Sequence, residues 1–228
     1  MDFCVFHKLT NEGYSVTWDK QKQLFQQLIE NKKTGADLPH HCISVEHPHV
    51  YTFGLHAKQN NMLATPEMLQ GMGAETYEIE RGGDITYHGP GQLVVYPILD
   101  LEKLGMGLKA YVEGLESCII SVLSDFGIKA GIIKGRVGVW VDIGSSSERK
   151  IAAIGIKSSR YITMHGIALN VNTDLKMFSH IVPCGIVDKG VTSMETELNE
   201  KIDLFEVNQS WVNHFCRKFG VIEQNEKA

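Results

Sequence analysis

The chain has 228 residues, of which 43% are hydrophobic and 21% are charged, and its formal net charge at pH 7 is -5. This balance is typical of an ordinary globular protein and gives no general footprint for binding nucleic acid. Apolar runs such as Leu93 to Leu99 are far shorter than the roughly 18 to 20 residues that cross a bilayer. We expect one α/β domain over residues 1–228 and no membrane span.

The N-terminal sequence MDFCVFHKLT has no cationic segment followed by a long apolar run, so a secretory signal is not expected. The cysteine usage agrees with this view. There are five cysteines, an odd number, and none forms a CxxC pair. Such a pattern favours free thiols in a reducing compartment, and we expect a cytoplasmic protein.

The first predicted element is an amphipathic helix that follows Thr17 and ends near Gly35. Thr17 is expected to be its N-cap, and the apolar residues Leu24 and Leu28 keep helical spacing. The next segment, HHCISVEHPHVYTFG, alternates and is rich in β-branched and aromatic residues. It predicts strands that flank a turn at His47-Pro48.

This segment also concentrates histidines with one cysteine: His40, His41, Cys42, His47 and His49. A zinc site is not favoured, because tetrahedral zinc usually draws on two separated ligand pairs and no second pair follows. Strand alternation also sends His41 and Cys42 to opposite faces. We expect no metal here, and the sequence leaves the role of this cluster open.

A short helix is predicted after Thr65, with Pro66 as its first residue and glycines at 71 and 73 to end it. The stretch from Thr76 to Leu101 then predicts two strands, residues 77–80 and 93–99, around a glycine-rich loop that holds Arg81, Tyr87 and His88. Glycines in such a loop allow backbone to approach a ligand closely. The loop matches neither GxxxxGK[ST] nor GxGxxG, so it is not a nucleotide-binding loop of the usual kinds.

The rest of the chain predicts alternating core elements. Residues 108–126 form an apolar helix that Gly127 ends, and short strands flank Gly135. The segments KIAAIGIK and ITMHGIALNVN read as strands. A last amphipathic helix begins at Asp203, with Glu206 completing a capping box, and ends at Gly220.

Positive charge is concentrated between Lys129 and Arg160, where basic residues exceed acidic ones by five although the whole chain is acidic. A surface of this sign would steer an acidic protein partner toward it. A solvated rim of hairpin loops explains the charge equally well.

The candidate nucleophile is Cys184, which lies between Pro183 and Gly185. This setting interrupts helix and strand and presents the thiol on a loop. A free thiol with a pKa of about 8.5 is only a few per cent thiolate at pH 7, and a nearby ammonium increases that fraction. Lys150 is the leading partner because it opens the apolar strand KIAAIGI. His88 and His165 are alternative bases for which a structural role is favoured.

A thiolate with a lysine partner suits acyl transfer through a thioester, and glycine-rich walls suit a thin acyl chain. Four segments of the chain carry a more specific signal: RGGDITYHGPGQLVVYPILDL, KIAAIG, MHGIALNVN, and IVPCGI followed by GVTSM. Together with HPHVYTFG they resemble the octanoyl-[acyl-carrier-protein]:protein N-octanoyltransferases, the lipoyl (octanoyl) transferases of lipoate biosynthesis. The resemblance runs from about Cys42 to Met194. One departure is Tyr161, where many relatives are expected to have tryptophan.

The resemblance implies a mixed sheet with flanking helices, as in biotin and lipoate protein ligases. It implies that Cys184 accepts the acyl group and that Lys150 tunes the thiol or moves protons. It also implies that the acyl site is lined by three segments: Arg81, Gly82, Gly83, Asp84, Ile85, Thr86, Tyr87 and His88; Ala153, Ile154 and Gly155; and His165, Gly166, Ile167 and Ala168.

The resemblance further implies a ping-pong reaction that transfers an octanoyl group from octanoyl-acyl carrier protein to a lysine on lipoyl domains. These acceptors include the lipoyl domains of 2-oxoacid dehydrogenases and the glycine cleavage H protein. It implies no cofactor, and we expect a monomer. Three other functions stay open on the residues alone: an ATP-dependent lipoate or biotin ligase, a module that only binds lipoyl domains or acyl carrier protein, and a cysteine-dependent hydrolase.

Overall fold

A computed structural model describes residues 2–182 and 190–225 of the chain. The first six strands are β1 (Asp2–Leu9), β2 (His40–Val45), β3 (Val50–Phe53), β4 (Glu75–Glu78), β5 (Ile85–His88) and β6 (Gln92–Ile98). The remaining strands are β7 (Ala130–Ile133), β8 (Arg136–Val141), β9 (Arg149–Ser159), β10 (Ile162–Asn170), β11 (Gly190–Val191) and β12 (Val221–Asn225). The α-helices are α1 (Tyr14–Thr34), α2 (Pro66–Gly71), α3 (Leu108–Asp125), α4 (Met194–Leu198) and α5 (Leu204–Phe219), and 3-10 turns occupy Gln59–Asn61 and Leu175–His180.

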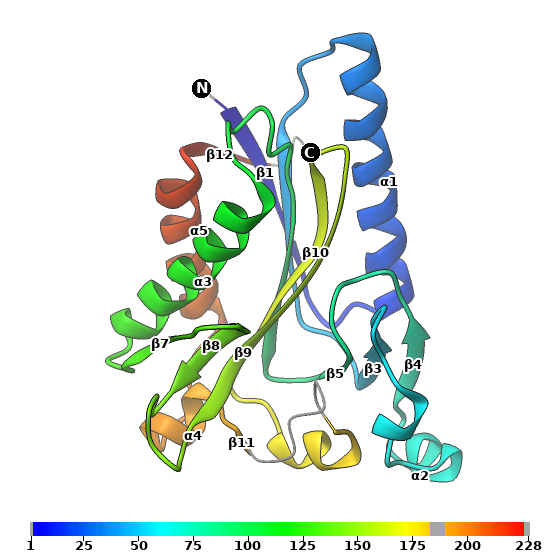
Figure 1. Cartoon of the computed structure of the whole chain (residues 1–228), viewed down its shortest axis with the longest axis vertical. Coiled ribbons are helices and arrows are strands. Elements are labelled where there is room, and N and C mark those ends of the chain that lie inside the picture. Colours follow the sequence, from blue (N-terminus) through cyan, green and yellow to red (C-terminus); the bar gives the residue numbers. More distant parts are fainter. Residues whose placement is uncertain (1, 183–189, 226–228) are drawn as a thin grey trace.

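The strands form one large mixed sheet and one small sheet (Figure 1). The large sheet has the order β12-β1-β2-β6-β10-β9-β8-β7, with β11 beside β9, and the small one has the order β4-β3-β5. Helix α1 covers one face of the large sheet, and α3 and α5 cover the other (Figure 1). The expected architecture of a mixed sheet with flanking helices is therefore confirmed.

Alternation along the strands separates the core into two layers. Cys42 belongs to the cluster under α3 and α5, whereas its neighbour Ile43 belongs to the cluster under α1. Trp211 and Phe215 of α5 are buried in the first cluster, and Leu24 and Leu28 of α1 are buried in the second. Burying such side chains stabilises the fold by about 1.5 to 3 kcal/mol each relative to leaving them exposed.

Several local signals proved accurate. Gly35 and Gly220 end α1 and α5 in the left-handed conformation that favours glycine. The Thr65 hydroxyl accepts a hydrogen bond from the Met68 amide at the start of α2, with Pro66 in the first turn. The carboxylate of Asp203 caps α5 by accepting from the Phe205 amide.

Two local predictions were wrong. Thr17 is not an N-cap, because α1 begins three residues earlier at Tyr14 and the Thr17 hydroxyl donates to the Gly13 carbonyl inside the first turn. Tyr87 and His88 do not lie in a loop but in β5, which pairs antiparallel with β3. Partners distant in sequence make this strand, which is why the loop composition around it concealed it.

The edge of the large sheet was not predicted at all. Strand β1 pairs in parallel with β2 on one side and with β12 on the other, where Asp2 lies opposite Val221. This pairing brings the beginning and the end of the described chain into one sheet. Strand β12 has few apolar residues, and its pairing with β1 is what fixes it.

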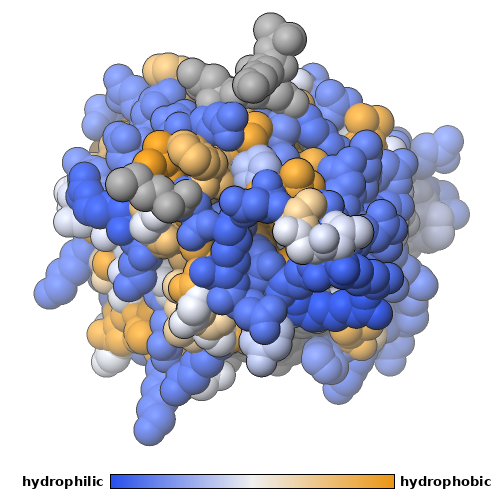
Figure 2. Space-filling view, turned by 90° about the horizontal axis from the view of Figure 1, so that it is seen from above, coloured by the Kyte–Doolittle hydropathy of each residue, from blue (hydrophilic) through white to orange (hydrophobic). Residues whose placement is uncertain are grey.

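The surface agrees with the composition. Figure 2 shows a face that is mainly hydrophilic, with separate hydrophobic areas between the charged side chains. Among residues 2–182 and 190–225, no helix has the length and apolar composition needed to cross a membrane.

The pairing of β10 with its neighbours contains an irregularity at His165 and Gly166. His165 has a φ of 59°, in the left-handed region. Gly166 follows it so close to β6 that a Cβ atom there would lie 2.2 Å from the Val95 carbonyl oxygen and 2.7 Å from Cδ of Pro97. Only glycine lets β6 and β10 approach to this distance.

We therefore predict that Gly166→Ala lowers the free energy of unfolding by about 2 to 3 kcal/mol, because the added methyl group must push β6 away from β10. Urea denaturation of both proteins measures this difference. Gly71→Ala is the matched control, since no atom lies within 4 Å of a Cβ at that helix end, and it should change stability little. Equal stability of Gly166→Ala and wild type would contradict the packing argument.

Candidate active site

The paired strands β9 and β10 form the floor of a cleft of about 500 Å³. Their register places Ala153 opposite Ala168 and Gly155 opposite Gly166, so small residues face each other along the floor. The structure brings most of the predicted acyl-site residues together here, with Lys150 among them. The cleft is lined by Arg81, Gly82, Gly83, Ile85, Thr86, His88, Lys150, Ala153, Ile154, Gly155, His165, Gly166, Ile167 and Ala168.

Lys150 lies near one end of β9 and is half-buried. Its ammonium nitrogen lies 4.7 Å from the centre of the Trp140 ring on β8, close enough for a cation–π interaction. The stem of the side chain packs over Gly138, where a Cβ atom would lie 3.4 Å from Cε of Lys150. The indole and the bare backbone of β8 thus hold this amine at the cleft wall.

Cys184, the predicted nucleophile, lies outside the described residues. The described chain before it ends at Val182, whose amide donates to the Asn61 carbonyl. The chain resumes in β11, where Val191 lies opposite Lys150, and the Thr192 amide then donates to the Lys150 carbonyl. Residues 190–192, which follow Cys184 in the sequence, are therefore bonded to the strand of Lys150.

Arg81 is buried beneath the glycine-rich loop and holds the loop in place through hydrogen bonds. Its Nε and Nη2 donate to the Thr52 hydroxyl, Nη2 also donates to the Thr52 carbonyl, and Nη1 donates to the Gly82 carbonyl. A Cβ atom on Gly155 would lie 2.9 Å from both Cδ of Arg81 and the Gly82 carbonyl oxygen. The absence of a side chain at Gly155 therefore allows the loop to close against the cleft floor.

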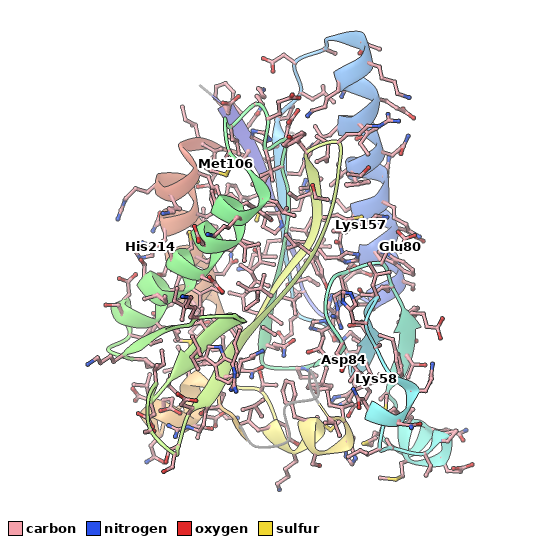
Figure 3. All side chains as sticks on the ribbon, in the orientation of Figure 1. Lys58, Glu80, Asp84, Met106, Lys157 and His214 are labelled. Carbon is pink, nitrogen blue, oxygen red and sulfur yellow. The ribbon has the colours of Figure 1, made fainter. Side chains whose placement is uncertain are left out.

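Two further contacts fasten this loop to β9. The Gly82 amide donates to the Ile156 carbonyl, and Lys157 forms an ion pair with Glu80. Figure 3 shows the Lys157 and Glu80 side chains next to each other beside the cleft strands. The loop position is thus determined by β9, although most of its own hydrogen bonds go to the small sheet.

Asp84 and Tyr87 of the predicted site do not line the cleft. The Asp84 carboxylate accepts hydrogen bonds from the Lys58 and Ile85 amides and from the Asn61 side chain, and Figure 3 shows Asp84 beside Lys58. The Tyr87 ring is fully buried, and its hydroxyl is 2.7 Å from Nδ1 of His49. Both side chains hold the loop and the small sheet in place.

The glycines after β5 also have internal roles. A Cβ atom on Gly89 would overlap the Tyr87 hydroxyl, and one on Gly91 would lie 2.3 Å from the Asn172 carbonyl oxygen. The glycine-rich loop was expected to bring backbone toward a ligand. In the structure only its first part, Gly82 and Gly83, faces the cleft, and the second part packs against protein.

His88 and His165 line the cleft but are almost completely buried. Burial lowers the pKa of each imidazole to about 3, and the nearby Arg81 charge acts in the same direction. Both rings are therefore neutral at pH 7. His88 Nδ1 lies 2.8 Å from Oε1 of Gln92, whose amide nitrogen donates to Asn170 and to the Tyr87 carbonyl. The expected structural hydrogen-bonding role is supported for His88. It is not found for His165, because neither of its buried ring nitrogens has a hydrogen-bond partner among the described residues.

Several residues that line the cleft were missed by sequence reasoning. They are Tyr14 of α1, Val94 and Tyr96 of β6, Leu108 and Val112 of α3, Gly135, Arg136 and Val137 at the β7–β8 turn, and Ile156 of β9, next to the predicted Gly155. Strand β6 follows the glycine-rich loop directly, whereas α1, α3 and the β7–β8 turn are distant from it in sequence. The β-rich and amphipathic patterns identified their elements, but only the sheet order and helix packing bring these side chains to one site.

The cluster between His40 and His49 is distributed among different contacts. His47 bridges the Tyr96 hydroxyl and the Glu12 carbonyl, His40 accepts from the Asp100 amide, and His41 stacks on His7. Within the part of the chain that the structure describes, no three His, Cys, Asp or Glu side chains gather where a metal ion could bind. The histidines that the sequence groups together thus serve different parts of the fold.

Residues 13–216 match the model of the lipoyl protein ligase A/B catalytic domain family. The chain belongs to this family. It is similar to an octanoyltransferase from Bacteroides fragilis, with 53% identity over 86% of this chain and 89% of that protein. It is also similar to an octanoyltransferase from Flavobacterium johnsoniae, with 45% identity over 92% of this chain and 94% of that protein. The resemblance inferred from the motifs is confirmed.

Solved structures of lipoate and biotin protein ligases have a similar fold. A bi-partite lipoate protein ligase from Thermoplasma acidophilum superposes with a TM-score of 0.71 at 14% identity, over 98% of this chain and 88% of that chain. A biotin protein ligase from Aquifex aeolicus reaches a TM-score of 0.51 at 13% identity, over 96% of this chain and 69% of that chain. The expected ligase-like fold is therefore confirmed, and at this identity the likeness concerns the fold alone.

The buried histidines around the site predict a dependence of stability on pH. Burial lowers the pKa of His47 to about 4, well below the ordinary value of about 6.5. The unfolded chain binds this proton as the pH falls through 6.5, whereas the folded protein does so only near pH 4. The stability contributed by neutral His47 is present above pH 6.5 and is lost as the pH falls toward 4.

We predict that His47→Gln reduces the slope of unfolding free energy against pH between 6 and 5 by about 1 kcal/mol per pH unit. Urea denaturation at several pH values gives both slopes. The absolute stability of the variant is expected to fall, because the bonds to Tyr96 and Glu12 are weakened. Parallel pH profiles for wild type and variant would show that His47 titrates normally in the folded protein.

Proposed function

We propose that this chain transfers an octanoyl group from octanoyl-acyl carrier protein to the ε-amine of a lysine on lipoyl domains, through a thioester on Cys184. The observation that carries the proposal is the cleft itself, in which Lys150 stands at the wall of a narrow trough floored by Ala153, Gly155 and Gly166. Relatives named octanoyltransferase, at 45% and 53% identity over most of the chain, support the choice of acyl group.

The reaction has two acyl transfers. The Cys184 thiolate attacks the thioester carbonyl of the donor, the carbon–sulfur bond to the carrier breaks, and the carrier thiolate takes a proton from the Lys150 ammonium. An acceptor lysine amine then attacks the acyl-enzyme and gives a proton to the neutral Lys150 amine. The bond to Cys184 breaks, an amide forms, and the thiolate again stands beside an ammonium.

No cofactor enters this scheme, because the energy of the donor thioester is sufficient. Exchange between thioesters is nearly neutral in free energy, and conversion of a thioester to an amide is downhill. Backbone N–H groups near Cys184 or along the Gly166 strand would bind the oxyanion that develops at the carbonyl, and each such donor is commonly worth about 3 kcal/mol.

The lining residues have a role in binding in this proposal. The backbone at Gly82, Gly83 and Gly155 would contact the acyl chain, because no side chain stands between backbone and cleft at these positions. The neutral rings of His88 and His165 leave the acyl site without histidine charge, which suits an uncharged ligand. Arg81 would act through the loop that it holds.

The domain and the partners are also part of the proposal. One catalytic domain over residues 1–228 accounts for the fold, since β1 and β12 pair in the same sheet as the cleft strands. Lipoyl domains of 2-oxoacid dehydrogenases and the glycine cleavage H protein would be the acceptors. The described cysteines Cys4, Cys42, Cys118 and Cys216 are free thiols, in keeping with a reducing compartment such as the cytoplasm.

An ATP-dependent ligase is the second candidate, because the solved structures with this fold include a lipoate-protein ligase A bound with ATP, at 14% identity. The higher identity to octanoyltransferases favours acyl transfer without ATP. The two functions differ in their dependence on Cys184, since an acyl adenylate needs no thiol.

We predict that the protein gains one octanoyl group when it is mixed with octanoyl-acyl carrier protein without ATP, as measured by intact mass spectrometry. Cys184→Ser should show no thioester adduct, because a serine hydroxyl is a much weaker nucleophile than a thiolate. Lys150→Ala should form the adduct at least 100-fold more slowly, since it lacks the cation and the proton carrier.

Addition of a lipoyl domain should discharge the adduct to the acceptor lysine. Release of free octanoate without an acceptor would indicate a hydrolase. Labelling that requires ATP and survives Cys184→Ala would indicate a ligase. If no adduct formed under any of these conditions, the protein would be a module that binds its partners without transferring an acyl group.

The basic segment predicts how the donor protein approaches. Lys134 is exposed at the β7–β8 turn, next to Gly135 and Arg136 of the cleft lining. We predict that Lys134→Glu lowers kcat/KM for octanoyl-acyl carrier protein several-fold at low salt, because the carrier is acidic. Activity with a small octanoyl thioester should change little.

Lys33→Glu is the matched control, since this exposed lysine lies near the end of α1 that Figure 1 places far from the β7–β8 turn. Its effect on the carrier reaction should be small. Equal losses for the two variants, or no salt dependence, would refute a local docking role for the basic segment.

A further inference from the structure

The two ends of the cleft differ in chemistry. The Lys150 side chain reaches along β9 to the level of Ala152, because Gly138 lies beside both the Lys150 Cε and the Ala152 carbonyl oxygen. From Ala152 the cleft follows β9 to Ile156, a rise of about 13 Å for four residues of strand. Near Lys150 and along Ala153 to Gly155 the walls are small or apolar. At the other end, Ile156 lies opposite His165, and Gly155 touches Arg81. An acyl chain whose carbonyl lies beside Lys150 therefore points its far end toward this second region.

The second region is built from aromatic and imidazole rings. Tyr14 and His88 have nearly parallel rings with centres 6.2 Å apart, and Tyr14 lies 5.2 Å from His47. The His47 ring holds the Tyr96 hydroxyl at 2.9 Å. Tyr14, His88 and Tyr96 all line the cleft, so this group of rings, which we call the end wall, closes the trough opposite Lys150.

Two polar atoms of the end wall are open to the cleft. The Tyr14 hydroxyl makes no hydrogen bond to any described residue. The residue is only 2% exposed, but the hydroxyl oxygen keeps some accessible surface. For His88, Nδ1 donates to Gln92, so Nε2 carries the lone pair. His88 Nε2 likewise has no hydrogen-bond partner among the described residues and keeps some accessible surface.

We infer that Tyr14, together with His88, sets the length of the acyl chain and favours a polar group at its end. This inference rests on the proposed function and adds a residue that determines specificity. A saturated chain gains about fourfold in binding for each methylene buried in the apolar part of the trough. A methylene that reaches the end wall would instead cover the Tyr14 hydroxyl and His88 Nε2 without forming a hydrogen bond to either. Binding of the acyl chain would then weaken about tenfold.

The same geometry gives a different result for a chain with a terminal hydroxyl. Such a group can accept from the Tyr14 hydroxyl and donate to His88 Nε2, so both open atoms would be satisfied. An 8-hydroxyoctanoyl group and a nonanoyl group have the same number of non-hydrogen atoms along the chain. Comparison of these two donors therefore separates the polar contact from chain length.

The test compares kcat/KM for octanoyl, nonanoyl and 8-hydroxyoctanoyl thioesters in wild type and Tyr14→Phe. We expect the ratio of 8-hydroxyoctanoyl to nonanoyl transfer to fall about tenfold in Tyr14→Phe, and the ratio of nonanoyl to octanoyl transfer to rise. Removal of the hydroxyl should leave the fold intact, because the hydroxyl has no partner among residues 2–182 and 190–225.

Tyr77→Phe is the matched control. Its ring lies 5.1 Å from that of Tyr14, but its hydroxyl donates to Glu75 and it does not line the cleft. Both ratios should be unchanged in this variant. Unchanged ratios in Tyr14→Phe would overturn the inference while leaving octanoyl transfer intact, and equal shifts in both variants would overturn it too. Absence of octanoyl transfer in wild type would instead overturn the proposed function.

Discussion

The site depends on the antiparallel pairing of β9 with β10. Gly155 lies opposite Gly166, and their neighbours Ala153 and Ala168 are also paired, so four small residues produce a flat floor. Every other part of the site is attached to this floor. The glycine-rich loop is bonded to Ile156, β11 is paired with Lys150, and Trp140 of β8 lies under the Lys150 ammonium. A shift of one residue in this register would turn the small residues away from the cleft.

The electrostatic surroundings differ between the two ends of the cleft. Lys150 keeps a cation at the wall where the thiol chemistry is proposed. At the other end, burial and the Arg81 charge keep His88 and His165 neutral, although they lie in a histidine-rich region. The Lys150 cation suits a thiolate and an oxyanion, and uncharged imidazoles beside the small floor residues suit the acyl chain. The same burial makes the fold sensitive to acid.

Much of this arrangement could be predicted from the sequence, and the limits have physical causes. Local signals located α2, the helix ends at Gly35 and Gly220, and the strands on either side of Gly135. They failed for β5 and β12, whose pairing partners lie far along the chain. The motifs placed most of the cleft lining correctly in one region. They could not indicate Tyr14 or Leu108, because helix packing alone brings these side chains to the cleft. Asp84 and Tyr87 belong to the motif, but the Asp84 side chain bonds to Lys58 and Asn61 and the Tyr87 hydroxyl to His49, outside the cleft.

The proposed reaction and the role of Tyr14 both require one acyl chain in the trough, with its carbonyl beside Lys150 and its far end at Tyr14. A crystal structure of the octanoylated protein would show where this chain lies. We expect a thioester on Cys184 within hydrogen-bonding reach of the Lys150 amine, and a chain that runs over Gly155 and Gly166 to the end wall. An octanoyl group on another residue, or a chain that leaves the trough empty, would contradict it.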